Sequence, residues 1–220
     1  MKDLPATAHS FRPASRATPP ASAMPVHAAP PWPTARPNVP TIYFTLGTVF
    51  NMESGDLFTR VVTGLRELPV NILVTVGPHI DPAERGVQPA HVRIERFIAQ
   101  ELVMPYCGVV VSHGGSGSVT GALAHGLPSV LMPMGADQSR NAVRCVQLGV
   151  ACVLDPVVAT AESVRDAAAA VLADGSFRRA AERIRDDFAT LPGPMHAVRL
   201  LERLVAEKRP IISAQQKRSA

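Results

Sequence analysis

The sequence predicts an α/β fold in which helices cover both faces of a doubly wound, Rossmann-like parallel β-sheet. Two observations predict it. Strand-like and helix-like segments alternate from residue 40 onward, and the strand-like segments are nearly continuous apolar runs. Such runs are typical of strands buried on both faces, and the alternation favours parallel strands joined by helices. Because ligands of such sheets bind beyond the carboxyl ends of the strands, the turns that follow strands are the first candidates for a site.

Composition and the spacing of apolar residues predict the first elements. The segment 40–46 is β-branched and aromatic, which predicts a strand, and 56–66 has apolar residues at helical spacing. A second strand is expected at 70–76, where the run VNILVTV is almost wholly apolar. A loop rich in Gly, Pro and Asp at 77–89 then separates it from a short strand at 92–97.

The alternation continues to the end of the chain. The next strand is a run of valines at 108–111. The following elements are, in order, helix 116–125, strand 128–132, helix 137–148, strand 150–154 and helix 161–173. Two more helices are expected from apolar stripes. The first stripe contains Phe177, Ala181, Ile184 and Phe188, and the second contains Ala197, Leu200, Leu201 and Leu204, ahead of Pro210.

The two ends of the chain differ from this pattern. Residues 1–40 contain 10 of the 21 prolines, and such a composition buries too little apolar surface to offset the entropy of ordering. We expect 1–40 to be a Pro- and Ala-rich disordered lead or interdomain linker. Residues 209–220 lack an apolar period and are expected to form a flexible tail. The remaining residues, 41–208, suit one domain.

Composition excludes several classes of protein. No run of 18 apolar residues exists, so no membrane span is expected. The net charge of +4 comes without a basic block, so we expect no nucleic-acid partner. The three cysteines lack metal-ligand spacing and are interpreted as reduced core thiols, which favours a cytoplasmic protein without a metal site.

A glycine-rich turn, His113-Gly-Gly-Ser-Gly-Ser118, lies between an expected strand and an expected helix. Glycines allow close approach to the backbone, and the first turn of a helix offers unpaired N–H groups and a partial positive charge. Together they suit a phosphate. The spacing matches neither the P-loop nor the dinucleotide fingerprint. On this segment alone, an ordinary tight turn is an equally good interpretation.

Two further segments could complete such a site. Asp137 and Gln138 follow the next strand, so they open at the same edge of the sheet and could hold sugar hydroxyls. The plainer alternative for Asp137 is a helix N-cap. Phe97 and Gln100 lie at the end of the expected strand 92–97, which precedes the strand leading into the glycine-rich turn, and they could bind a nucleobase and ribose. Taken alone, Phe97 is more typical of a core residue.

Taken in order, these segments resemble the donor-binding signature of the GT-B fold UDP-glycosyltransferase superfamily, especially its bacterial branch acting on macrolides and other natural products. The family pattern is an aromatic strand end, HGGxG[TS], a GxP turn and DQxxNA. The matching segments are Phe97-Ile-Ala-Gln100, His113-Gly-Gly-Ser-Gly-Ser118, Gly126-Leu-Pro128 and Asp137-Gln-Ser-Arg-Asn141-Ala142. The resemblance spans roughly residues 40–205 and identifies 41–208 as a donor-binding domain, the C-terminal half of a GT-B fold.

The resemblance implies a role for each matching position. Phe97 would stack on the nucleobase, with the Ile98 main chain and Gln100 recognising base and ribose. The diphosphate would be held by Thr48, His113, Gly115, Gly117 and Ser118. The hydroxyls of the donor sugar would be bound by Asp137 and Gln138.

The implied activity is inverting, metal-independent transfer of a hexose from a UDP- or dTDP-sugar to a small-molecule acceptor. The nucleotide sugar is a substrate, so no cofactor and no metal are expected. The reaction needs support for the leaving diphosphate and a base for the acceptor. The family's base is a histidine of an N-terminal acceptor domain, and no histidine of this chain takes its place. We therefore assign no catalytic residue and expect the isolated chain to be an incomplete enzyme whose acceptor domain is missing or separate.

The sequence departs from the family pattern at two positions. Many members have Glu, which binds the ribose hydroxyls, three residues after the last Ser of the turn, where this chain has Gly121. That difference is compatible with a dTDP-sugar. The expected Pro before Gln100 is Ala99. Besides a glycosyltransferase half, a non-catalytic nucleotide-sugar binding or interaction module remains an alternative. The ordered signature disfavours an epimerase or a lipid-intermediate glycosyltransferase.

Overall fold

A computed structural model describes residues 36, 38–47 and 54–212 of the chain. In this part of the chain six strands form one sheet. The strands are β1 (Thr41–Thr45), β2 (Asn71–Thr75), β3 (Val92–Glu95), β4 (Cys107–Ser112), β5 (Ser129–Leu131) and β6 (Ala151–Val153). All neighbours pair in parallel, in the order β3-β2-β1-β4-β5-β6. The predicted α/β fold with a doubly wound parallel sheet is confirmed.

The helices agree with the sequence prediction except in two connections, between β2 and β3 and between β3 and β4. The predicted helices are α1 (Leu57–Arg66), α3 (Ser116–Ala124), α4 (Gln138–Gln147), α5 (Ala161–Ala173), α6 (Gly175–Thr190) and α7 (Pro194–Glu207). The unpredicted ones are α2 (Gln100–Val103) and the 3₁₀ turns η2 (Pro82–Arg85) and η3 (Met104–Tyr106). These are too short to show a helical period, so tertiary contacts decide them.

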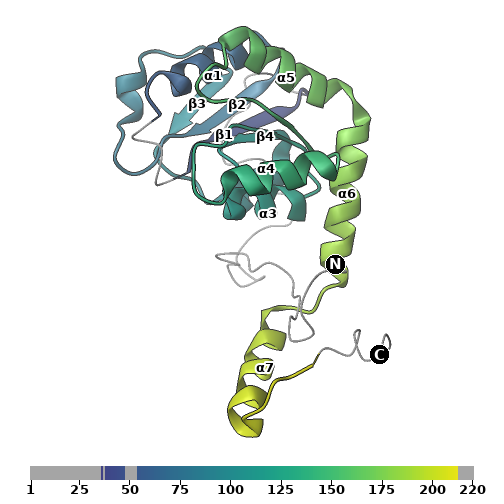
Figure 1. Cartoon of the computed structure of the whole chain (residues 1–220). Helices are drawn as coiled ribbons and strands as arrows, with labels where there is room; N and C mark the ends of the chain where they lie inside the picture. The colour runs from purple at the N-terminus through teal and green to yellow at the C-terminus, as the bar shows by residue number, and fades with distance from the viewer. Residues whose placement is uncertain (1–35, 37, 48–53, 213–220) are drawn as a thin grey trace. The chain divides into compact units, whose positions relative to one another are not determined.

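Successive residues of the central strands enter two different cores. On β1, Ile42 and Phe44 pack in the cluster that includes residues of α1 and α5. Tyr43, between them, packs instead in a cluster with Met104 of η3 and Ala122 of α3. Figure 1 shows the two layers, with α1 and α5 on one side of the sheet and α3 and α4 on the other. This two-sided burial explains why the strands are apolar throughout.

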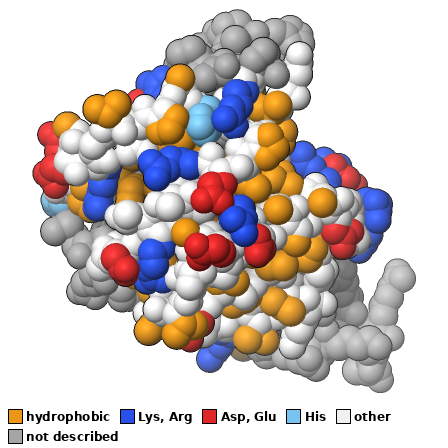
Figure 2. All heavy atoms as spheres, turned by 90° about the horizontal axis from the view of Figure 1, so that it is seen from above, with side chains coloured by type: hydrophobic (Ala, Val, Ile, Leu, Met, Phe, Trp, Pro, Cys, Tyr) orange, Lys and Arg blue, Asp and Glu red, His pale blue; other side chains and the backbone are white. Residues whose placement is uncertain are grey.

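Helices α1 and α5 touch at Gly64. A Cβ atom built on Gly64 would overlap the carbonyl oxygen of Ala161, the first residue of α5. Gly64 therefore permits the two helix backbones to approach more closely than any other residue would. At the same helix pair, Arg165 of α5 forms an ion pair with Glu67 at 2.8 Å. Figure 2 shows basic and acidic side chains interspersed on the face viewed from above.

Arg36 lies five residues ahead of β1, inside the stretch 1–40 assigned to the disordered lead. Its backbone N–H donates to Oδ1 of Asn71 at 3.1 Å, and Nδ2 of Asn71 donates back to the Arg36 carbonyl at 2.8 Å. Its guanidinium donates to the carbonyl of Leu68 at 2.9 Å. The buried Asn71 side chain thus fixes the backbone just ahead of β1.

Among the described residues, those from 36 to 185 form one compact unit, and α7 belongs to a second. Pro194 opens α7, and the helix ends at Glu207 with Lys208 in the left-handed conformation (φ 50°). The end therefore precedes Pro210 by three residues. Among the helices of the described ranges, none is both long and apolar enough to cross a membrane.

Candidate functional site

The glycine-rich turn lies where the strand order reverses direction. Strands β1 and β4 are neighbours in the sheet, although they are far apart in the sequence, and their last residues Thr45 and Ser112 pair in register. On one side of β1 the order continues to β2 and β3, and on the other side β4 continues to β5 and β6. Such a switch point is where open α/β sheets bind ligands. The prediction that this turn opens at the ligand edge agrees with the topology.

The backbone of the turn depends on Gly114. Its φ of +80° lies in the left-handed region that favours glycine, and its N–H donates to the Ser112 hydroxyl at 3.3 Å. Gly115 is the N-cap of α3, and the helix begins at Ser116. Ser116 and Gly117 are exposed, so the first-turn backbone of α3 is open to solvent. A Cβ atom on Gly117 would meet no atom within 4 Å.

The His113 ring is held between two glycines. A Cβ atom built on Gly47, after β1, would lie 2.7 Å from Cε1 of His113. One built on Gly115 would overlap Nε2 of the same ring. Burial lowers the pKa of His113, and hydrogen bonding with the Thr45 backbone and the charge of Asp137 oppose that shift. The imidazole is therefore fixed in place and favours its neutral form.

Asp137 does not cap its own helix. It is the N-cap residue of α4, but its side chain accepts no capping hydrogen bond from the backbone of that helix. Its Oδ2 instead accepts from the Ser116 hydroxyl at 2.5 Å and from Nδ2 of Asn141 at 2.9 Å. These two hydrogen bonds hold the pKa of the Asp137 carboxyl below its usual range. Asn141 also donates to the carbonyl of Gly114 at 3.0 Å, so the start of α4 is bonded to the glycine-rich turn.

Gln138 is turned inward. Its side chain is buried, and its Oε1 accepts from the backbone N–H groups of Met134 at 2.7 Å and Gly135 at 3.1 Å. The carboxamide oxygen thereby closes the turn between β5 and α4. This arrangement supports the turn geometry, in which Ala136 has a φ of +53°. Of the two residues expected to hold sugar hydroxyls, Asp137 is exposed and Gln138 is not.

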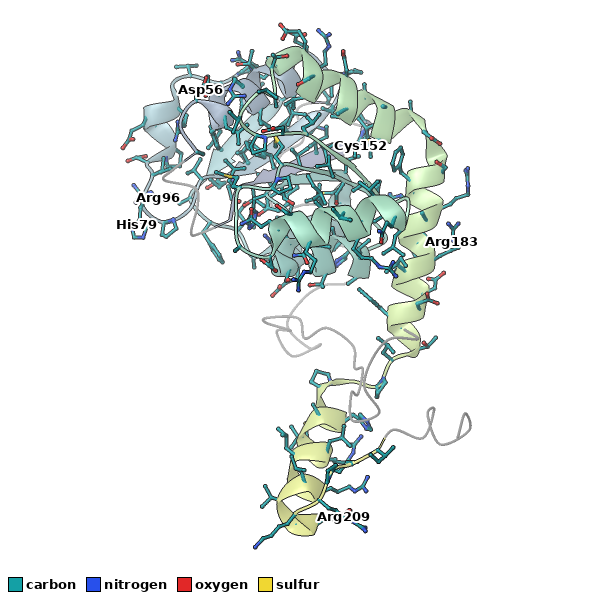
Figure 3. The ribbon with its side chains drawn as sticks, in the orientation of Figure 1. Asp56, His79, Arg96, Cys152, Arg183 and Arg209 are labelled. Atoms are coloured by element: carbon teal, nitrogen blue, oxygen red, sulfur yellow. The ribbon has the colours of Figure 1, made fainter. Side chains whose placement is uncertain are left out.

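In the segment after β3, Arg96 and Phe97 are exposed, and Ile98 and Gln100 are partly buried. Phe97 is 70% exposed, which contradicts its interpretation as a core residue. Beside it, the Arg96 guanidinium pairs with Asp81 at 3.0 Å, and Figure 3 labels Arg96 at this edge of the molecule. Ile98 packs against the core cluster around Tyr43. Phe97 therefore projects into solvent while the chain returns toward the sheet.

Gln100 faces the interior of this segment. It opens α2, and its Nε2 donates to the hydroxyl of Ser118 at 3.3 Å. Hydrogen bonding to Gln100 also acts on the buried phenol of Tyr43, whose pKa is raised mainly by burial. Ser118 is only 5% exposed. The structure thus joins a residue expected at the base, Gln100, to one expected at the diphosphate, Ser118.

Ser116 and Asn141 have positions in the site that sequence reasoning did not assign. Asn141 was part of the matched motif and lies four residues after Asp137, a spacing that puts both on one face of a helix. Ser116 has no such signal beyond its place in the turn. Thr48 lies outside the described residues. Within those residues, no cluster of three His, Cys, Asp or Glu side chains could hold a metal ion.

The chain matches a known protein family over most of its described residues. The family model described as "Erythromycin biosynthesis protein CIII-like, C-terminal domain" matches residues 59–204. Demethyllactenocin mycarosyltransferase of Streptomyces fradiae is 31% identical over 175 residues, which are 80% of this chain and 38% of that protein. TDP-daunosamine transferase DnrS of Streptomyces peucetius is 33% identical over 190 residues, covering 82% of this chain and 43% of that protein.

Solved structures give the same result. CalG4, the calicheamicin glycosyltransferase, has a TM-score of 0.73 at 28% identity, over 81% of this chain and 46% of that one. Spinosyn rhamnosyltransferase SpnG complexed with thymidine diphosphate has a TM-score of 0.71 at 29% identity, over 80% of this chain and 48% of that one. The chain thus spans less than half the length of these relatives.

Proposed function

Since this chain belongs to the family of C-terminal domains like that of erythromycin biosynthesis protein CIII, we propose that it binds the nucleoside diphosphate of an activated sugar as the donor half of a glycosyltransferase. The observation that carries the proposal is the exposed first turn of α3 at the switch point of the sheet. There the backbone of Ser116 and Gly117 faces solvent beside His113. Helix N-termini of this kind bind phosphate groups through unpaired N–H donors.

The exposed ring of Phe97 supports a nucleotide rather than a simple phosphate. An aromatic side chain that is 70% exposed at the end of β3 presents an apolar face on which a base can stack. Phe97 and the diphosphate turn belong to the carboxyl edge of the same parallel sheet. We propose that the base lies on Phe97, the diphosphate on the turn from His113 to Ser118, and the sugar beside Asp137.

We propose a dTDP-sugar as the donor. Gly121 stands where many UDP-sugar enzymes of the superfamily have a carboxylate for the ribose hydroxyls, and deoxyribose lacks one of those hydroxyls. A Cβ atom on Gly121 would lie 3.2 Å from the sulfur of the buried Met104, so a larger residue would have to displace that side chain. One relative is named as a TDP-daunosamine transferase, and two of the similar solved structures hold the thymidine nucleotide.

In the proposed reaction the sugar is transferred with inversion and without a metal. Negative charge develops on the leaving diphosphate. The N–H groups of α3 and the positive end of its dipole stabilise that charge. The acceptor's proton requires a separate base. Of the described histidines only His113 lies in the turn; His91 bonds to the carbonyl of Arg66 and His125 to that of Gly121. We therefore propose that the base and the acceptor site come from another region or a partner.

Calorimetry with the purified chain tests the proposal. TDP is expected to bind more tightly than UDP, and thymidine monophosphate more weakly than TDP, because it lacks one phosphate for the turn. No heat with either diphosphate at millimolar concentration would refute the proposed function. Tighter binding of UDP than of TDP would refute only the assignment of the donor.

A non-catalytic nucleotide-sugar binding module is the second candidate, because the chain spans less than half of its enzymatic relatives. Both candidates predict binding of TDP. They differ in the neighbouring coding sequence. A region that encodes an acceptor domain, in frame or as an adjacent gene, supports the glycosyltransferase, and restored transfer on adding that domain would exclude the binding module.

A further inference from the structure

The Asp137 carboxylate lies on the donors of the glycine-rich turn. Its Oδ2 accepts from the hydroxyl of Ser116 at 2.5 Å, and the backbone of Ser116 also stabilises the ionised carboxylate. Ser116 is the first residue of α3, so its N–H has no acceptor within the helix. The negative charge of Asp137 is also close enough to act on His113. An internal anion therefore sits at the start of α3 when the site is empty.

A second anion at the same position would compete with it. Under the proposed function, on which this inference rests, the diphosphate binds the first-turn donors of α3. Two negative groups cannot share these donors without repulsion. The carboxylate has room to leave, because Asp137 is exposed and precedes α4 rather than lying within it.

Asn141 would keep the turn in place while Asp137 moves. Its Nδ2 donates to the carbonyl of Gly114 at 3.0 Å and lies 3.3 Å from the Ser116 hydroxyl, in addition to its bond to Asp137. Two of these contacts do not involve the carboxylate. The connection between α4 and the glycine-rich turn would thus persist in both positions of Asp137.

We propose that Asp137 occupies the diphosphate's donors in the empty site and is released toward the donor sugar when the diphosphate binds. Displacing the carboxylate costs free energy. A nucleotide sugar offsets that cost, because its hydroxyls donate hydrogen bonds to the released carboxylate. The product nucleoside diphosphate has no sugar and receives no such compensation. Asp137 therefore weakens the binding of the product relative to the substrate, which favours product release.

The test measures TDP affinity by calorimetry in wild type, Asp137→Asn and Asp137→Ala. The Kd for TDP is expected to fall by about two- to fivefold in both variants, the change that corresponds to one charge at a helix N-terminus. A residue that contacts only the sugar would leave the Kd for TDP unchanged. Thermal unfolding of each variant confirms that it folds, as expected for an exposed side chain.

Asp174→Asn is the matched control for the change in net charge. Asp174 is exposed, ends α5 on the opposite edge of the sheet and, like Asp137, has its pKa lowered by hydrogen bonds. Its variant is expected to bind TDP as wild type does. Equal or weaker TDP binding by both Asp137 variants overturns the proposal. So does a gain in Asp174→Asn equal to that in the Asp137 variants. Failure of the wild type to bind TDP overturns the proposed function and the inference with it.

Discussion

Alanine at Gly117 and at Gly64 should separate ligand binding from stability. Both residues are glycines of helices, so the chemical change is the same. A methyl group on Gly117 meets no atom within 4 Å, so it is accommodated without movement. Since alanine is the better helix former, the free energy of unfolding is expected to stay the same or to rise by up to about 1 kcal/mol.

The same change at Gly64 should destabilise the protein. Its new Cβ overlaps the backbone carbonyl of Ala161, and a backbone atom cannot move aside as a flexible side chain can. Overpacking costs about 1–3 kcal/mol, and a clash with a backbone atom places this change at about 2–3 kcal/mol, of which the gain in helix propensity offsets about 1 kcal/mol. A net loss of about 1–2 kcal/mol lowers the Tm of a chain of this size by roughly 2–8 °C.

Binding should show the reverse pattern. A methyl group on Gly117 projects from the exposed first turn of α3, so it keeps a diphosphate from the N–H groups there. Losing one hydrogen bond to a charged group costs about 1.5–3 kcal/mol, which raises the Kd for TDP by roughly 10- to 150-fold. Gly64 lies in α1, on the other face of the sheet, and its variant should bind TDP with the wild-type Kd once folded.

Thermal unfolding followed by circular dichroism measures the first property, and calorimetry with TDP, at a temperature well below both Tm values, measures the second. Wild-type TDP affinity in Gly117→Ala would show that the diphosphate does not use the first turn of α3. A wild-type Tm for Gly64→Ala would show that α1 and α5 do not approach as closely as described. The two results are independent of one another.

Three further predictions concern single side chains of the site. Because Phe97 is 70% exposed, Phe97→Ala should change the free energy of unfolding by less than about 0.5 kcal/mol, while the affinity for thymidine and for TDP falls by the roughly 1–3 kcal/mol of base stacking; unchanged affinity contradicts stacking. Gln100→Ala should weaken binding of TDP but not of thymidine, because its amide bonds to the hydroxyl of Ser118; loss of thymidine binding would instead assign Gln100 to the base. Burial lowers the pKa of His113, so the unfolded chain takes up a proton at a higher pH than the folded one. The contribution of neutral His113 to the free energy of unfolding is complete above about pH 6.5 and declines as the pH falls further. The free energy of unfolding, measured with urea at pH 7.5 and 5.5, should therefore decrease less in His113→Gln than in wild type.

Most of the fold could be predicted because its strands are buried on both faces. Runs such as that of β2 are unambiguous when an apolar side chain occurs at nearly every position, and all five residues of β2 are buried. The connection from β3 to β4 could not be predicted in this way. There Val103 and Met104 are buried against Tyr43, which lies far away in the sequence. The chain therefore forms short helical turns that a local apolar period does not predict.

The site was predictable as a set of backbone positions but not as a set of side-chain contacts. The motif located the turn at His113 and the start of the helix after Asp137. It did not indicate that Asp137 bonds across to Ser116 rather than capping α4, because that depends on how the N-termini of α3 and α4 lie relative to each other. The inward direction of Gln138 has a local origin, since its oxygen accepts from the N–H groups of Met134 and Gly135 and closes the turn between β5 and α4.

Two glycines, at positions 47 and 115, lie against the His113 ring. Gly47 and Gly115 are visible in the sequence as turn residues, and each is compatible with many structures. The His113 ring fills the space that a side chain at either position would occupy, and Gly47 also has a φ of +76°. The contact with Gly115 arises within the turn itself, two residues from His113. The contact with Gly47 exists because β1 lies beside β4 in the strand order, which brings the turn after the first strand against the turn after the fourth. The requirement for glycine at position 47 therefore depends on the topology of the sheet, which places the candidate ligand site at the same point.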